Sequence, residues 1–150
     1  MPNRPTVLIE HGRTEEQCEI MRRIAKDGVD PFDWDQLSKY HVQPVLKKGT
    51  YWLVTPNDNP YEGSTLHLLL IYRDRIASFA EMALTGWMEL LSTIRWIQQE
   101  YGVTYGALVM RFGELLLSGA SVDHPHMHVV VGGDSNKAEK LKVSIGYKQK

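Results

Sequence analysis

The chain has 150 residues, of which 43% are hydrophobic and 23% are charged. These values are ordinary for a soluble globular protein, and the length fits one domain with a sizeable core. The formal net charge of −1 gives no electrostatic case for a nucleic-acid or membrane-surface partner. The single cysteine, Cys18, excludes an internal disulfide framework, and no apolar signal region or bilayer-spanning stretch is visible. We therefore expect a cytoplasmic protein.

The first part of the chain predicts one extended segment and one helix. Residues 6–10 have the pattern of a short strand or an extended arm. Thr14 followed by Gln17 is a capping-box pattern, which predicts a helix over residues 15–26. Gly28 ends this helix, because glycine readily adopts the left-handed conformation found at helix ends.

The middle of the chain predicts two strands joined by a turn. Residues 32–40 are ambiguous between a loop and a short helix. Residues 51–54 predict a strand, and the Pro- and Asn-rich residues 56–60 predict a turn. Residues 66–72 form a near-continuous apolar run, which indicates a buried central strand.

The second half predicts the longest helix of the chain. Ser78 with Glu81 is a second capping box, and apolar positions at helical spacing continue to about residue 101, where Gly102 closes the helix. Further strands are expected at residues 105–112, 124–131 and 141–147. The predicted fold class is therefore α+β, a largely antiparallel sheet with one long helix and a shorter N-terminal helix.

The most informative motif is a row of histidines. His124, His126 and His128 occupy every second position of a predicted strand that continues into three valines. Because a strand alternates its side chains between faces, the three imidazoles should point the same way. Such a row can accept protons, donate protons or attack an electrophile near neutral pH.

Two readings of this row involve no covalent chemistry. The histidines could be structural, although burying three imidazoles without purpose is costly. They could also bind zinc, because strand neighbours two apart are separated by roughly 6.6 Å and can share one ion. His124 and His128 lie roughly 13 Å apart along an ideal strand, too far for one tetrahedral centre. A further zinc ligand would come from His67, Asp123 or Asp134.

The third reading is phosphoryl chemistry. A neutral imidazole can attack phosphorus and form a covalent intermediate, which water then displaces. The central His126 is the natural nucleophile, with its other ring nitrogen held as a donor to fix the tautomer. The flanking histidines could contact the phosphate and the leaving group. Upstream, the Gly- and Ser-containing residues 118–123 permit a tight turn with backbone amides facing an anion, and the hydroxyl of Ser121 could donate to a phosphate oxygen.

These residues resemble the histidine triad (HIT) superfamily of nucleotide hydrolases and transferases. The family signature is His-x-His-x-His followed by apolar residues, which residues 124–131 match, and residues 119–123 resemble its Gly-x-Ser loop. Residues 57–60 and 67–71 resemble the ribose-binding turn and the His-led strand beside it. The resemblance covers roughly residues 51–133 and implies a HIT-like fold.

The resemblance also implies roles for individual residues. His126 matches the nucleophile that takes the nucleoside monophosphate, His128 contacts the phosphate and leaving group, and His124 helps to order the site. The implied substrate-binding residues are Asn57 at the ribose, Ser121 and Gly119 in the phosphate loop, and His67 as a supporting histidine.

Some positions depart from the family pattern. Pro125 resembles the His-Pro-His of galactose-1-phosphate uridylyltransferases, which carry Gln where this chain has His128. Residues 61–65 are more similar to the transferase and dinucleoside polyphosphate phosphorylase branches. Arg111 stands near the place where the family often has a side-chain amide, and could supply a positive donor instead. A transferase and a catalytically weak nucleotide-binding module therefore remain as alternatives.

The resulting expectation is a nucleotidyl hydrolase that cleaves a purine nucleotide conjugate, a phosphoramidate or dinucleoside polyphosphate, at its α-phosphate. No cofactor or metal is required for the covalent step, although Mg²⁺ could accompany a polyphosphate. The family suggests a homodimer, paired through the long helix and its neighbouring strand. Residues 51–133 would form the core of a single domain, with residues 1–50 as an extension of undefined role and 134–150 as a C-terminal strand and tail.

Overall fold

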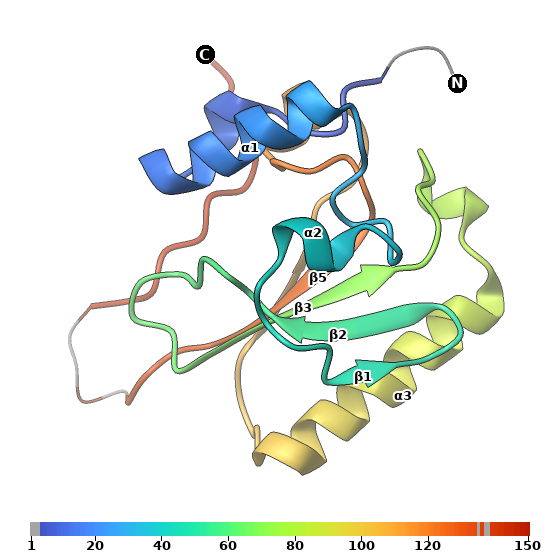
Figure 1. Cartoon of the computed structure of the whole chain (residues 1–150). Helices are drawn as coiled ribbons and strands as arrows, with labels where there is room; N and C mark the ends of the chain where they lie inside the picture. Colours follow the sequence, from blue (N-terminus) through green and yellow to red (C-terminus); the bar gives the residue numbers. More distant parts are fainter. Residues whose placement is uncertain (1–3, 135, 137–138) are drawn as a thin grey trace.

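The computed structural model describes residues 4–134, 136 and 139–150. They form a five-stranded antiparallel sheet of order β1-β2-β3-β5-β4 (Figure 1). The strands are β1 Lys47–Lys48, β2 Trp52–Pro56, β3 Leu66–Tyr72, β4 Ala107–Met110 and β5 His126–Val131. The helices are α1 Glu15–Asp27, α2 Leu37–Tyr40, α3 Leu84–Tyr101 and α4 Leu115–Ser118, with 3₁₀ turns at Ile9–His11 and Phe79–Glu81. The predicted α+β class is confirmed. No helix of the described part of the chain is long and apolar enough to cross a bilayer.

Helix α3 covers one face of the sheet. Trp52 and Val54 of β2, with Leu70 of β3, form one buried cluster with Leu90 and Ile97 of α3. Alternate residues of a strand share a face, so the sheet presents a continuous apolar surface to one side of the helix. Burial of each such side chain contributes about 1.5–3 kcal/mol. This face anchors the sheet and leaves the other face for the histidines.

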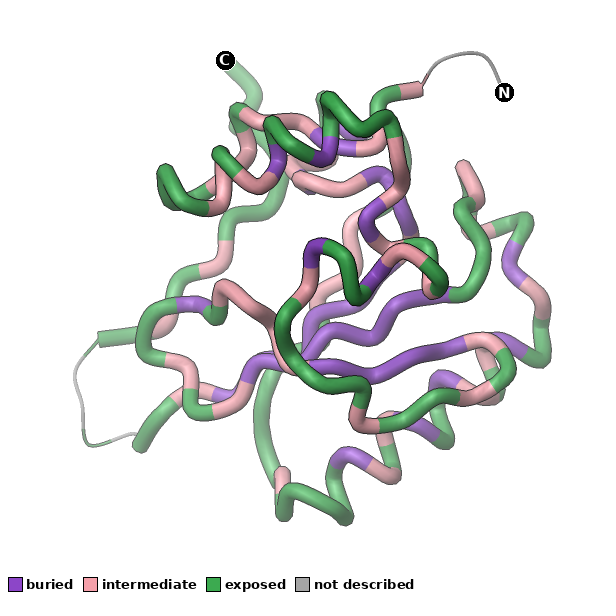
Figure 2. Tube along the Cα trace, in the orientation of Figure 1, coloured by how far each residue is buried: buried purple, intermediate pink, exposed green. Residues whose placement is uncertain are grey.

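The N-terminal segment covers the opposite face. Leu53, Leu69 and Ile71 are buried there against Leu37 of α2, with Phe32 packed beside them. The pairing register places His128 opposite Leu69 and His126 opposite Ile71. The two histidines therefore lie on the face that Phe32 and α2 cover, and Figure 2 shows these central strands buried between exposed outer segments.

The N-terminal predictions agree closely with the structure. The Thr14 hydroxyl accepts a hydrogen bond from the Gln17 backbone amide, and Gly28 ends α1 at φ 66°. A cap of this kind stabilises a helix by about 1 kcal/mol. The extended arm is confirmed at Val7, which forms an isolated bridge with Val122, but it ends earlier than predicted, because Ile9–His11 form a 3₁₀ turn. This bridge brings the arm to the loop that precedes the histidines.

The long helix begins later than predicted. The capping box of Ser78 and Glu81 is present, but it opens a single 3₁₀ turn. Met82 has an extended backbone (φ −74°, ψ 130°) and is 5% exposed. Its side chain is buried in the core, and the helix is interrupted at this residue. Helix α3 then starts at Leu84 and ends at Gly102, as predicted for that end.

The strand predicted at residues 141–147 is wrong. Residues 139–150 carry no strand in the structure. Ile145 and Tyr147 are 76% and 66% exposed, so the apolar side chains of the alternating pattern are not buried against a sheet. The segment instead runs from the sheet toward α1, where the Tyr147 hydroxyl lies 2.6 Å from His11 Nε2.

Candidate active site

His126 is held in the tautomer that a nucleophile needs. Its Nδ1 donates to the backbone carbonyl of His124 at 2.6 Å, so Nδ1 carries the proton and Nε2 has a lone pair. Phe32 lies edge-on at 4.9 Å between ring centroids and fixes the ring plane. Burial lowers the pKa of His126 to about 4, although the hydrogen bond to His124 raises it in part. The ring is therefore neutral at physiological pH.

His128 is held in the opposite tautomer through His67. The Tyr61 backbone amide donates to His67 Nδ1 at 3.0 Å, so the proton of His67 must be on Nε2. That Nε2 lies 2.9 Å from His128 Nδ1 and donates to it. His128 therefore carries its own proton on Nε2, which is buried without a hydrogen-bond partner among the described residues.

The amide of Asn57 forms no hydrogen bond with His67 in this assignment. Its Oδ1 accepts from the Asn59 backbone amide at 2.8 Å, so its Nδ2, which is also a donor, faces His67 Nε2 at 3.1 Å, and the Nε2 proton is directed to His128. Burial and the charge of Arg13 lower the pKa of His67 to about 4. Burial, followed by the charges of the neighbouring histidines and arginines, lowers the pKa of His128 still further.

His124 supports the site from behind. The strand begins at His126, so His124 lies just before it, and its ring does not line the cavity that His126 and His128 share. Its Nδ1 lies 2.7 Å from the Asp30 carboxylate and its Nε2 lies 2.5 Å from the Tyr72 carbonyl. Both partners are hydrogen-bond acceptors. His124 is thus fixed at both ring nitrogens, and its backbone carbonyl accepts from His126 Nδ1.

Asp30 is a site residue that the sequence analysis missed. Its side chain is 15% exposed and that of His124 is 1% exposed. Burial raises the pKa of Asp30, but the hydrogen bond and charge of His124, with the Phe32 amide and the charge of Arg75, together leave that pKa below its usual value. The N-terminal segment thus supplies the counter-charge of the triad, although nothing in the spacing of Asp30 signals this.

The phosphate-loop candidates lie where they were predicted. Gly119 adopts φ 74°, a left-handed conformation that favours glycine, and a Cβ there would lie 3.3 Å from the backbone nitrogen of Gly146. Ser121 lines the same cavity as His126 and His128. His11 Nδ1 donates to the Ala120 carbonyl at 2.5 Å, so the arm holds this loop in place.

The predicted ribose turn is also held by a residue outside the resemblance. Asn57 lines the cavity. The neighbouring Asp58 accepts from the backbone amides of Val42 and Gln43, and lies 3.1 Å from His41 Nδ1. Burial lowers the pKa of His41 although Asp58 opposes this. The end of α2 therefore fixes the conformation of the turn.

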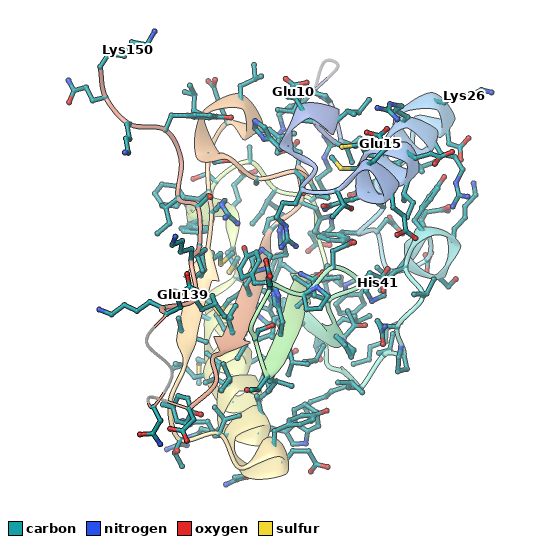
Figure 3. All side chains as sticks on the ribbon, turned by 90° about the vertical axis from the view of Figure 1, so that its left-hand side faces the viewer. Glu10, Glu15, Lys26, His41, Glu139 and Lys150 are labelled. Carbon is teal, nitrogen blue, oxygen red and sulfur yellow. The ribbon has the colours of Figure 1, made fainter. Side chains whose placement is uncertain are left out.

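One cavity of about 1810 Å³ joins these elements. Of the predicted residues, it is lined by Asn57, Gly119, Ser121, His126 and His128. His67 lies behind His128, and His124 lies behind His126. Figure 3 shows the side chains between the C-terminal segment, where Glu139 lies, and the N-terminal segment, where His41 lies; both residues line the cavity.

Arg111 lies at this cavity, as its position in the sequence suggested. Its charge lowers the pKa values of both His126 and His128. Its Nη2 donates to the Ser144 carbonyl, whereas its Nε is buried without a partner among the described residues. A positive donor therefore stands beside both histidines. Within the described residues, no three His, Cys, Asp or Glu side chains are arranged to hold a metal ion.

The chain is similar to solved structures but not to any known family or curated protein by sequence. No protein-family model matches the chain, and no curated protein matches it by sequence. Among solved structures, a histidine triad nucleotide-binding protein from Candida albicans is similar (TM-score 0.55, 12% identity, 76% of this chain and 80% of that one). A HIT family hydrolase from Clostridium thermocellum is similar over 70% of this chain and 91% of its own (TM-score 0.50, 18% identity).

A zinc-bound histidine triad family protein from Mycobacterium smegmatis is also similar (TM-score 0.50, 15% identity, 71% of this chain and 78% of that one). The chain therefore has the fold of the histidine triad proteins, as its sequence motifs predicted.

Proposed function

We propose that the protein is a nucleotidyl hydrolase of the histidine triad type, acting on a purine nucleotide conjugate at its α-phosphate. The observation that carries this proposal is the pair of opposite tautomers at one cavity. His126 presents a lone pair on Nε2, and His128 presents a proton on Nε2. One ring is set to attack and its neighbour is set to donate.

The proposed reaction has two displacement steps. In the first, His126 Nε2 forms a bond to the α-phosphorus and the bond to the leaving group breaks, while the neutral His128 donates a hydrogen bond from Nε2 to the departing atom, which takes its proton from solvent. In the second, water attacks phosphorus, its proton passes to solvent, and the bond to His126 breaks. The His124 carbonyl stabilises the positive charge that develops on His126. Ser121, the loop amides and Arg111 stabilise the equatorial oxygens.

Substrate binding would use the rest of the cavity. Asn57 would contact the ribose hydroxyls, Gly119 would shape the phosphate loop, and His67 would act on the phosphate only through His128. No metal or other cofactor is needed for these steps, although Mg²⁺ could accompany a polyphosphate. We propose a cytoplasmic protein whose partner is the nucleotide, with no nucleic-acid or membrane partner.

A homodimer is part of this proposal. Leu84, Met88 and Leu91 form an apolar stripe along α3, with 82%, 68% and 65% of each residue exposed. Leu108 on the edge strand β4 is 50% exposed. An apolar stripe beside an open sheet edge is typical of a surface that a partner covers, and a second copy of this chain would cover both.

A nucleotidyltransferase is the second candidate. The cavity of about 1810 Å³ exceeds the roughly 300–1000 Å³ of a usual small-molecule site. A nucleotide would leave room for an acceptor such as phosphate or a sugar phosphate, which would replace water in the second step.

The test is release of adenosine monophosphate from an adenosine phosphoramidate and from a diadenosine polyphosphate. We expect release by the wild-type protein and none above background by His126→Ala. Release only when phosphate or a sugar phosphate is added would favour the transferase. Binding of nucleotide without any turnover would contradict both enzymes and leave a nucleotide-binding module.

A further inference from the structure

Two arginines from opposite parts of the chain converge on His128. Arg13, which precedes the region of resemblance, lies over the Tyr61 ring at 4.5 Å and donates to the Asn59 carbonyl. The Tyr61 ring is itself stacked on His128, at 5.7 Å and 15° between planes. Arg111 approaches from the end of β4, and both arginines line the cavity. Two guanidinium groups therefore line the cavity into which His128 presents its Nε2 proton.

Neither arginine is paired with a carboxylate of residues 4–133 or 139–150. Asp58, Glu62 and Glu139 also line the cavity, yet none of them forms an ion pair with Arg13 or Arg111. By contrast, Arg4 and Arg75 are both paired with Asp123. Unpaired, partly buried guanidinium groups are costly, and they repel each other. An anionic ligand would offset both costs.

The electrostatic environment supports the same conclusion. Burial lowers the pKa of Arg13, Tyr61 opposes that shift, and the charge of Arg111 adds to it. Arg111 influences both His126 and His128, whereas Arg13 influences His128 and His67. Arg111 is thus near the attacking ring as well as the donor, and Arg13 is near the donor and its supporting histidine. The two charges would meet different parts of one ligand.

We propose that Arg13 is a specificity-determining residue that binds a phosphoryl group beyond the α-phosphate, while Arg111 binds the α-phosphate itself. The preferred substrate is then a nucleoside oligophosphate, whose leaving group is anionic, and not a nucleotide joined to a neutral amine. This inference rests on the proposed function, because it takes the α-phosphate to lie at His126. As the anhydride P–O bond breaks, the charge on the leaving phosphate increases, and Arg13 would stabilise it.

Calorimetric binding of two non-hydrolysed ligands tests the proposal. Adenosine monophosphate carries only the α-phosphate, and α,β-methylene adenosine diphosphate adds one phosphoryl group. A charge-assisted hydrogen bond of this kind is worth about tenfold or more in affinity. We expect the wild-type protein to prefer the diphosphate analogue by about tenfold or more. Arg13→Gln should reduce the preference to near unity while monophosphate affinity changes little.

Three further variants separate the roles. Arg111→Gln should weaken both ligands, and Arg13→Lys should keep part of the preference, because it keeps the charge but loses the planar stack on Tyr61. Arg22→Gln is the matched control: Arg22 pairs with Glu15 on α1, and it does not line the cavity. Thermal unfolding of each variant establishes that it is folded. A wild-type protein without preference, or a folded Arg13→Gln variant that retains it, would overturn the proposal.

The binding ratio is independent of turnover, so the two proposals fail separately. Loss of the preference in Arg13→Gln together with no adenosine monophosphate release from any conjugate would contradict the hydrolase and uphold the role of Arg13. Release of adenosine monophosphate by the wild-type protein, together with an unchanged preference for the diphosphate analogue in Arg13→Gln, would uphold the hydrolase and contradict the role of Arg13.

Discussion

Replacement of His67 tests the hydrogen-bond chain that sets the proton on His128. His67 is 5% exposed, accepts from the Tyr61 amide and donates to His128 Nδ1. His67→Leu leaves two buried polar groups without partners, each at a cost of about 1–3 kcal/mol. We therefore expect the free energy of unfolding to fall by about 2–5 kcal/mol. His67→Gln should lose less, because its amide offers both an acceptor and a donor.

The same pair of variants should separate in catalysis. In His67→Leu, His128 is no longer held with its proton on Nε2, so kcat should fall about 100-fold or more, as for loss of a hydrogen-bond donor to the charge that develops on the leaving group. His67→Gln should recover most of that loss, with KM nearly unchanged in both. Urea unfolding and initial rates of adenosine monophosphate release measure the two effects. A folded His67→Leu variant with wild-type kcat, or a His67→Gln variant as slow as it, would refute the reasoning.

Three further predictions follow from the geometry. The pKa values of His67 and His126 in the folded protein are about 4, below the ordinary value of about 6.5. Between these two values the unfolded chain binds more protons than the folded one, so the free energy of unfolding should fall as the pH drops from about 6.5 to about 4. Urea midpoints that do not change across this range would contradict the prediction. Asp30→Asn should lower kcat about tenfold or more with little change in KM, because His124 loses its counter-charge; wild-type kinetics would show that Asp30 does not support the triad. Leu91→Asp should convert a dimer to a monomer in light scattering, and an unchanged mass would exclude this surface.

The elements that could be predicted are those with local signals. The Thr14 cap and Gly28 mark both ends of α1, and the apolar run of β3 is buried over the predicted residues. The Ser78 capping box was misleading, because the same local signal opens a single turn when the next residues are drawn into the core. Local pattern also could not show that the C-terminal segment has no sheet edge to join.

The candidate site divides in the same way. The residues of the triad and the two loops could be predicted because motif spacing within a strand fixes which side chains share a face. Asp30 and Arg13 could not, because their partners lie far away in the sequence: Asp30 and His124 are 94 residues apart, and Arg13 and Asn59 are 46 apart. Only the packing of the N-terminal segment against the sheet brings them to the histidines.

The most direct measurement is the intact mass of the protein after brief mixing with a nucleotide conjugate, followed by acid-free quenching. The account predicts a wild-type adduct equal to one nucleoside monophosphate, absent in His126→Ala, that maps to the peptide containing His126. An adduct that persists in His126→Ala, or rapid hydrolysis by the wild-type protein with no adduct under single-turnover conditions, would contradict attack by His126.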